Sequence, residues 1–152
     1  MEITKKTASD CANYIADTLK PVLRLNDWSF DWRFEQMDRH AEGSVTMGQA
    51  HVDYNRLEVV IFVDTFRHED DFVEFVDTLR HEVLHATHFM WSRAINIFRE
   101  MVPDGFEALA AAYWADACEE HVAYFGRILD TLGYDVETLA EGFTARLAEQ
   151  AK

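Results

Sequence analysis

The sequence predicts an α+β fold in a single domain, and three observations lead to this prediction. The chain has the length of one domain, and 49 % of its 152 residues are hydrophobic, which is enough to bury a core. Hydrophobic residues recur at helical spacing near the start of the chain and over its second half. Between these segments the period changes to two, as in half-buried strands. We therefore expect one domain over residues 1–152, ordered as a helix, three strands and three helices.

The first helix and two strands are expected in the first third of the chain. Small and aliphatic residues repeat at helical spacing over Thr7–Leu19, and Pro21 is expected to end or kink this helix. Aromatic residues alternate with polar ones over Trp28–Glu35, which predicts a strand with one buried face. A looser alternation over Ser44–Tyr54 predicts a second strand, with Gly48 as a candidate bulge.

The third strand and the helix after it carry the strongest patterns. After a turn at residues 53–56, the β-branched run inside Leu57–Val63 predicts a strand. The acidic residues Glu69, Asp70 and Asp71 are then expected to open a long helix, because negative charge suits the positive end of the helix dipole. This helix has an apolar stripe formed by Phe72, Phe75, Val76, Leu79, Val83 and Ala86.

Two further helices are expected in the last third of the chain. The chain is expected to turn near Pro103, after which Asp104 and Glu107 are spaced as a capping pair for a helix that reaches about Leu132. Gly133 ends this helix. Its core-facing stripe comprises Trp114, Cys118, Val122, Phe125, Leu129 and Leu132. Asp135 caps the last helix, whose apolar face comprises Val136, Leu139, Ala140, Phe143 and Leu147.

Charge and cysteine content exclude several classes of protein. The formal net charge of −14 disfavours direct binding to nucleic acids and to anionic membrane surfaces. Cys11 and Cys118 are too few and too far apart for a disulfide framework or a cysteine zinc site, so both are expected to be buried as small hydrophobic residues. Neither a signal-like leader nor a long apolar run occurs, which predicts a cytoplasmic protein.

The string His81-Glu82-Val83-Leu84-His85 lies inside the second expected helix. Residues four apart share one face of a helix, so His81 and His85 can bind one metal ion. Glu82 lies about 100° around the helix from His81, where it can reach a water molecule on that ion. This spacing predicts a zinc centre with a glutamate as general base, since a structural zinc site would have no use for that glutamate.

Such a centre needs a third protein ligand, and four residues are candidates. Glu119 flanks the apolar stripe of its helix among small residues, which would let another helix approach closely. Glu120 points away from that stripe, and His121 lies on its opposite flank. His88 is one turn beyond His85, but three successive ligands on one straight helix fit a tetrahedral ion poorly. The helical positions of these residues favour Glu119 as the third ligand, and Glu120, His121 and His88 remain alternatives.

The HExxH string, together with the part of the next expected helix that reads Glu119-Glu120-His121, resembles zincins of the gluzincin type. The chain is most similar to small prokaryotic and phage proteins of the ImmA/IrrE and SprT-like kinds, over about residues 28–130. The resemblance implies a minimal zincin-like fold and a zinc-dependent peptidase, with His81, His85 and Glu119 as ligands and Glu82 as general base. It also places Leu57–Val63 as the edge strand of the sheet, along which a peptide or protein substrate would add.

The sequence differs from the patterns of two zincin classes. The residue ten positions after His81 is Trp91, which excludes a metzincin. The residue four positions after Glu119 is Ala123, where many gluzincins have an aspartate, so Asp116 or a backbone carbonyl would have to orient a histidine ligand. Peptide hydrolysis also needs a donor that stabilises the oxyanion. The candidates are His121, Tyr124, Tyr113 and His88, and the sequence does not choose among them.

A rival interpretation is a binding protein rather than an enzyme. The chain would then be a zincin-like protein of prokaryotic or phage anti-defence type. Its acidic surface would bind a basic partner protein. Reversing the charge of Glu69, Asp70 and Asp71 would then abolish activity, whereas Glu82→Gln would not. A basic protein is the partner to look for under either interpretation.

Overall fold

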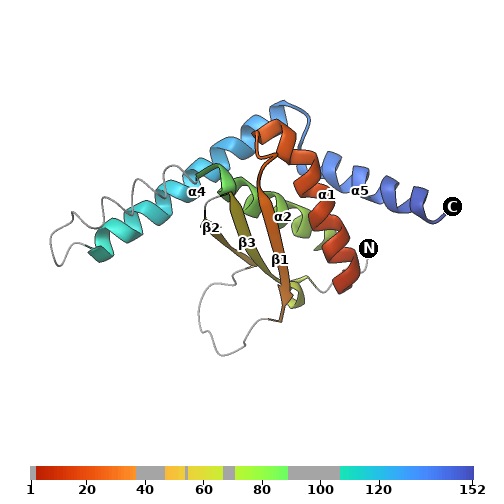
Figure 1. The fold of residues 1–152 in the computed structure, drawn as a ribbon, viewed down its shortest axis with the longest axis horizontal. Helices are drawn as coiled ribbons and strands as arrows, with labels where there is room; N and C mark the ends of the chain where they lie inside the picture. Colours follow the sequence, from red (N-terminus) through yellow and green to blue (C-terminus); the bar gives the residue numbers. More distant parts are fainter. Residues whose placement is uncertain (1–2, 37–46, 54, 67–70, 89–106) are drawn as a thin grey trace.

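The structure, a computed structural model, describes residues 3–36, 47–53, 55–66, 71–88 and 107–152. Its main elements are α1 (Lys5–Leu23), β1 (Ser29–Glu35), β2 (Gly48–Asp53), β3 (Arg56–Phe62), α2 (Phe72–His85), α4 (Glu107–Thr131) and α5 (Val136–Gln150). Two short 3-10 turns, η1 (Val63–Thr65) and η3 (Ala86–His88), follow β3 and α2 (Figure 1). The expected α+β layout of one helix, three strands and three helices is confirmed within the described residues.

The three strands form one sheet in the order β1-β3-β2. β1 runs parallel to β3, and β2 runs antiparallel to it. The expectation that Leu57–Val63 is an edge strand is therefore wrong, because β3 is paired on both sides. Its apolar character comes from this central position, where Leu57, Val59 and Ile61 are fully buried. β1 and β2 are the edge strands of the described sheet.

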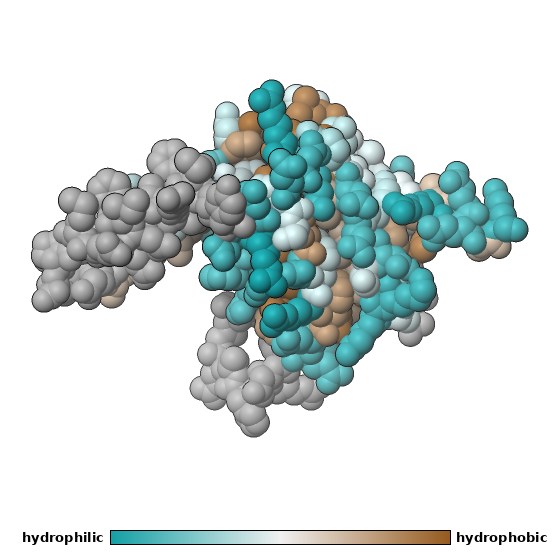
Figure 2. Space-filling view, in the orientation of Figure 1, coloured by the Kyte–Doolittle hydropathy of each residue, from teal (hydrophilic) through white to brown (hydrophobic). Residues whose placement is uncertain are grey.

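Helices α1 and α2 pack on the sheet, and α4 and α5 pack on α2. The core lies on one face of the sheet. The alternating side chains of β1 and β3 that point to this face join one core with residues of α1, α2 and α5. The opposite face carries ion pairs instead: Arg56 Nη2 lies 2.6 Å from Asp31 Oδ2 and 3.1 Å from Glu58 Oε1. Figure 2 shows mostly hydrophilic residues on the side of the molecule where the strands lie in front of α2. These exposed pairs add solubility more than stability.

The first helix is longer than expected. Thr4 caps its start by accepting a hydrogen bond from the Thr7 backbone N–H. The helix continues through Pro21 to Leu23, so Pro21 does not end it. Proline lacks one backbone donor, but a helix near its last turn tolerates this loss because little helix remains to be disrupted. The helix ends where Arg24 adopts a left-handed conformation with φ 58°.

The boundary between the last two helices is as expected. Gly133, with φ +81°, ends the turn after α4, and the Asp135 side chain caps α5 by accepting from the Thr138 backbone N–H. Leu132, however, is 58 % exposed and is not part of the core.

The two cysteines differ in burial. Cys11 is buried, as expected, whereas Cys118 is only half-buried. No helix in the described part of the chain is long and apolar enough to cross a membrane.

Several sequence expectations fall outside the described residues. They concern the helix start at Glu69 and Asp70, the turn near Pro103, the cap at Asp104, and the first part of the strand expected from Ser44.

Candidate metal centre

The structure brings together His81, His85 and Glu119, from two different helices. α2 supplies the two histidines, which lie one turn apart on the same face of the helix. α4 packs against α2 and supplies Glu119. The Nε2 atoms of His81 and His85 are 3.3 Å apart. Glu119 Oε2 lies 3.2 Å from His81 Nε2, and Glu119 Oε1 lies 3.7 Å from His85 Nε2.

These separations suit a tetrahedral metal ion. Zinc binds imidazole nitrogen and carboxylate oxygen at about 2.0–2.1 Å, so two ligand atoms at tetrahedral corners are about 3.3 Å apart. The 3.3 Å between the two histidine Nε2 atoms and the 3.2 Å from His81 Nε2 to Glu119 Oε2 match this spacing. His85 Nε2 lies 3.7 Å from the other carboxylate oxygen of Glu119, Oε1. A fourth corner has no ligand among the described residues.

The cluster opens to solvent on one side. The side chains of His81 and Glu119 are 39 % and 58 % exposed, whereas that of His85 is 17 % exposed. Burial, with His81 nearby, lowers the pKa of His85 from 6.5 to about 4. His85 is thus a neutral imidazole at pH 7, which is the form that binds a metal ion.

Glu82 lies beside the cluster as a buried carboxylate. It is 4 % exposed, and its Oε2 atom has no hydrogen-bond partner among the described residues. The same atom lies 4.0 Å from His85 Nε2. Burial, with the negative charge of Glu119 nearby, raises the pKa of Glu82 from 4.5 to about 7. A carboxylate with this pKa can both accept and return a proton near neutral pH.

Gly48 allows the edge strand β2 to approach Glu82. The candidate bulge at Gly48 is wrong, because Gly48 pairs with Ile61 in the regular ladder of β2 and β3. The glycine is needed for a close approach instead: a Cβ atom there would lie 2.7 Å from Glu82 Oε1 and 3.0 Å from Ile61 Cδ1. A glycine in a strand marks either a bulge or a close approach, and sequence spacing cannot separate the two.

We expect Gly48→Ala to destabilise the protein by about 1–3 kcal/mol, because Glu82 and Ile61 must both shift to admit the methyl group. Chemical unfolding of the metal-free protein measures this loss. The matched change on the same strand is Ala50→Ser, which adds one atom at a half-buried position and should cost less. Equal losses for both variants would contradict the close approach.

Arg80 joins α2 to α4 next to the cluster, and the sequence reasoning missed it. Its side chain is 6 % exposed and donates to the Gly126 carbonyl oxygen and to Asp130 Oδ1, 2.6 Å away. These bonds fix the distance between the helix of His81 and the helix of Glu119. The available signal was an arginine on the buried side of a helix, directly before the HExxH string, since buried charges are nearly always paired.

The other ligand candidates lie elsewhere. Glu120 is exposed, as expected, and its neighbour in the chain, Glu119, occupies the site. His88 is 2 % exposed, with neither ring nitrogen hydrogen-bonded among the described residues, and its ring centroid is 4.4 Å from that of His121. The His88 ring also contacts that of His85, with centroids 5.6 Å apart. Asp116 is exposed.

The four candidate oxyanion donors differ in access. Tyr113 and Tyr124 are 76 % and 56 % exposed. His121 is half-buried and stacks on Phe125, with ring centroids 4.8 Å apart. His88 is buried, and burial, with His121 and His85 nearby, lowers its pKa to about 4. These positions do not single out one donor.

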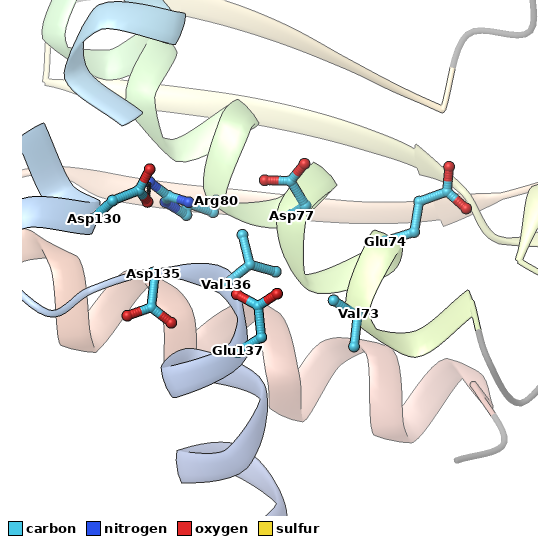
Figure 3. Close-up of a pocket in the computed structure, with 8 residues that line it drawn as sticks. All are labelled: Val73, Glu74, Asp77, Arg80, Asp130, Asp135, Val136 and Glu137. Atoms are coloured by element: carbon cyan, nitrogen blue, oxygen red, sulfur yellow. Dashed lines mark hydrogen bonds and ion pairs between the residues drawn. The ribbon is translucent and has the colours of Figure 1, made fainter. Parts of the chain in front are cut away.

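Two of the described cavities meet at His81. One, of about 260 Å³, lies between β2 and α2; we call it the β2–α2 groove, and it is lined by Met47, Gly48, Glu74, Asp77, Thr78, His81 and Glu82. The other, of about 230 Å³, lies between α2 and α4 and includes His81, Leu84 and Gly126. A larger cavity of about 780 Å³ lies along α2 and the start of α5, away from the histidines (Figure 3). The candidate metal centre therefore lies between the two smaller cavities.

No protein-family model, curated protein or solved structure matches this chain.

Proposed function

We propose that this protein is a zinc-dependent peptidase. The observation that supports this most strongly is the cluster of His81, His85 and Glu119 beside the buried carboxylate of Glu82, whose Oε2 has no hydrogen-bond partner among the described residues. The donor set of two histidines and one glutamate is that of catalytic zinc sites, which keep one position free of protein ligands. A zinc ion held by these residues would lower the pKa of a water molecule bound to it towards about 7.

In this proposal the residues of the chain have separate roles. His81, His85 and Glu119 would hold the ion, and the ion pair between buried Arg80 and half-exposed Asp130 joins their two helices. Glu82 accepts the proton of the attacking water and returns it to the leaving amine, which its pKa of about 7 permits. The oxyanion donor would come from the residues around the cluster, with His121 and the two tyrosines as accessible candidates.

The substrate would lie along β2 rather than along β3. Phe62 N–H donates to the Met47 carbonyl oxygen at 3.0 Å, so Met47 belongs to a hydrogen-bonded pair of the antiparallel ladder. Hydrogen-bonded and non-bonded pairs alternate along such a ladder. The backbone groups of Gly48, Ala50 and Val52 therefore point away from β3, to the free edge of β2. An extended peptide can add there as a further strand, with Gly48 next to Glu82.

The experiment is hydrolysis of a library of internally quenched peptides by zinc-loaded protein. We expect cleavage that stops when 1,10-phenanthroline removes the metal and returns when zinc is added, because the nucleophile depends on the ion. Full activity of the chelated protein, verified as metal-free, would contradict the proposal.

A further inference from the structure

We propose that the β2–α2 groove is a specificity subsite that takes a lysine or arginine side chain of the peptide substrate, with Glu74 and Asp77 as the recognition residues. This inference rests on the proposed peptidase function and names its substrate class.

The groove begins at the candidate catalytic residues and runs along one face of α2. Glu82 and His81 line it, so it is continuous with the metal cluster. Asp77 precedes His81 by four residues and Glu74 by seven, and this spacing puts all three on one helix face. Glu74 and Asp77 also line the large cavity drawn in Figure 3, where their carboxylates project from the same side of α2. The opposite wall is the start of β2, where Met47 Sδ lies 3.8 Å from Thr78 Oγ1 of α2.

The charge lining this groove is negative. Glu74 and Asp77 are exposed carboxylates, and neither forms an ion pair with a described residue. No lysine or arginine is among the described residues that line the groove. Glu82 also lines the groove; it is more than nine-tenths buried, and its Oε2 has no hydrogen-bond partner among the described residues. A cationic side chain would satisfy the two exposed carboxylates, and its aliphatic stem can pack on Met47.

The distances indicate where in the substrate that side chain stands. At 1.5 Å per residue, Asp77 and Glu74 lie about 6 and 10 Å from His81 along the axis of α2. An extended peptide advances about 3.3 Å per residue. The basic residue is therefore expected about two or three residues from the scissile bond. An acidic residue at the same position would be repelled.

The test compares matched peptides that differ at one position, with lysine, glutamine or glutamate placed in turn at each residue within four of the scissile bond. For the zinc-loaded protein we expect kcat/KM to favour lysine over glutamine by about tenfold at the best position, a size typical of one or two partly exposed ion pairs. In the double variant Glu74→Gln/Asp77→Asn this ratio should fall to about 1. The control Glu137→Gln removes an exposed carboxylate that lines only the large cavity, and should keep the wild-type ratio.

A second measurement keeps this inference separate from catalysis. The same fluorescent peptides are bound to zinc-loaded Glu82→Gln protein and followed by anisotropy, with and without the Glu74 and Asp77 changes. Tighter binding of the lysine peptide that disappears in the variants supports the subsite, even where the wild-type protein cleaves nothing and the proposed function fails. Equal binding and equal cleavage of lysine and glutamine peptides would overturn it, and so would a preference that survives in Glu74→Gln/Asp77→Asn.

Discussion

Glu82→Gln is expected to reduce peptide hydrolysis by about 10²–10⁴-fold, because the amide cannot accept the proton of the attacking water. The change keeps the size of the side chain, and Glu82 is not one of the three clustered donors, so bound zinc should be retained. The measurement is kcat/KM on the best peptide of the library, together with the zinc content of the same sample. Unchanged hydrolysis in the zinc-loaded variant would contradict the role of Glu82.

The stability of the metal-free protein shows whether Glu82→Gln acts through chemistry or through unfolding. A carboxyl group with pKa about 7 when folded and 4.5 when unfolded costs stability as the pH rises between these values. Above pH 7 this ionisation lowers the free energy of unfolding by about 3 kcal/mol. Glutamine does not ionise, so the variant does not lose this stability. Metal-free Glu82→Gln should therefore be more stable than wild type at pH 8 and nearly equal to it at pH 4.

The same variant decides between the peptidase and the rival interpretation, an acidic protein that binds a basic partner. A binding protein keeps its biological effect when Glu82 becomes glutamine and loses it when surface carboxylates are reversed in charge. A peptidase shows the opposite pattern for Glu82→Gln.

Glu119→Gln is expected to weaken zinc binding by more than about 100-fold, since losing a direct ligand should cost at least as much as losing a residue that only orients one. Among the described residues, Glu119 joins the two histidines in one cluster: its Oε2 lies 3.2 Å from His81 Nε2 and its Oε1 lies 3.7 Å from His85 Nε2. Competition with a chromophoric chelator measures the change in Kd. The matched control is Glu120→Gln, an exposed carboxylate one residue further along α4, for which the Kd should stay within about twofold. A larger loss in Glu120→Gln than in Glu119→Gln would assign the third ligand differently.

Much of the helical part of the site could be predicted from the sequence. The period of 3.6 residues decides which side chains share a helix face, so the HExxH string placed His81 and His85 together. The same wheel put Glu119 at the edge of the α4 stripe and Glu120 towards solvent, which agrees with where the structure places them. Such patterns are local, and each can be read within a few turns of one helix.

The contacts between elements could not be predicted in the same way. Alternation identified Leu57–Val63 as a strand, but it carries no information on the neighbours of that strand, and β3 proved to be central. The spacing around Gly48 did not distinguish a bulge from the close approach to Glu82. The partner of Arg80, Asp130, is 50 residues away on another helix. Leu132 has the period of the core stripe, yet α4 ends at Thr131, one residue earlier, and the side chain is exposed.

We propose that His81, His85 and Glu119 together hold a zinc ion. A crystal structure of zinc-loaded protein, with anomalous scattering recorded on both sides of the zinc absorption edge, tests it most directly. We expect one zinc ion per chain, bound by both Nε2 atoms and a Glu119 oxygen at about 2.0–2.2 Å, with no fourth protein ligand. Zinc held by another set of residues, such as His88 and His121, or no ordered zinc in protein saturated with the ion, would contradict it.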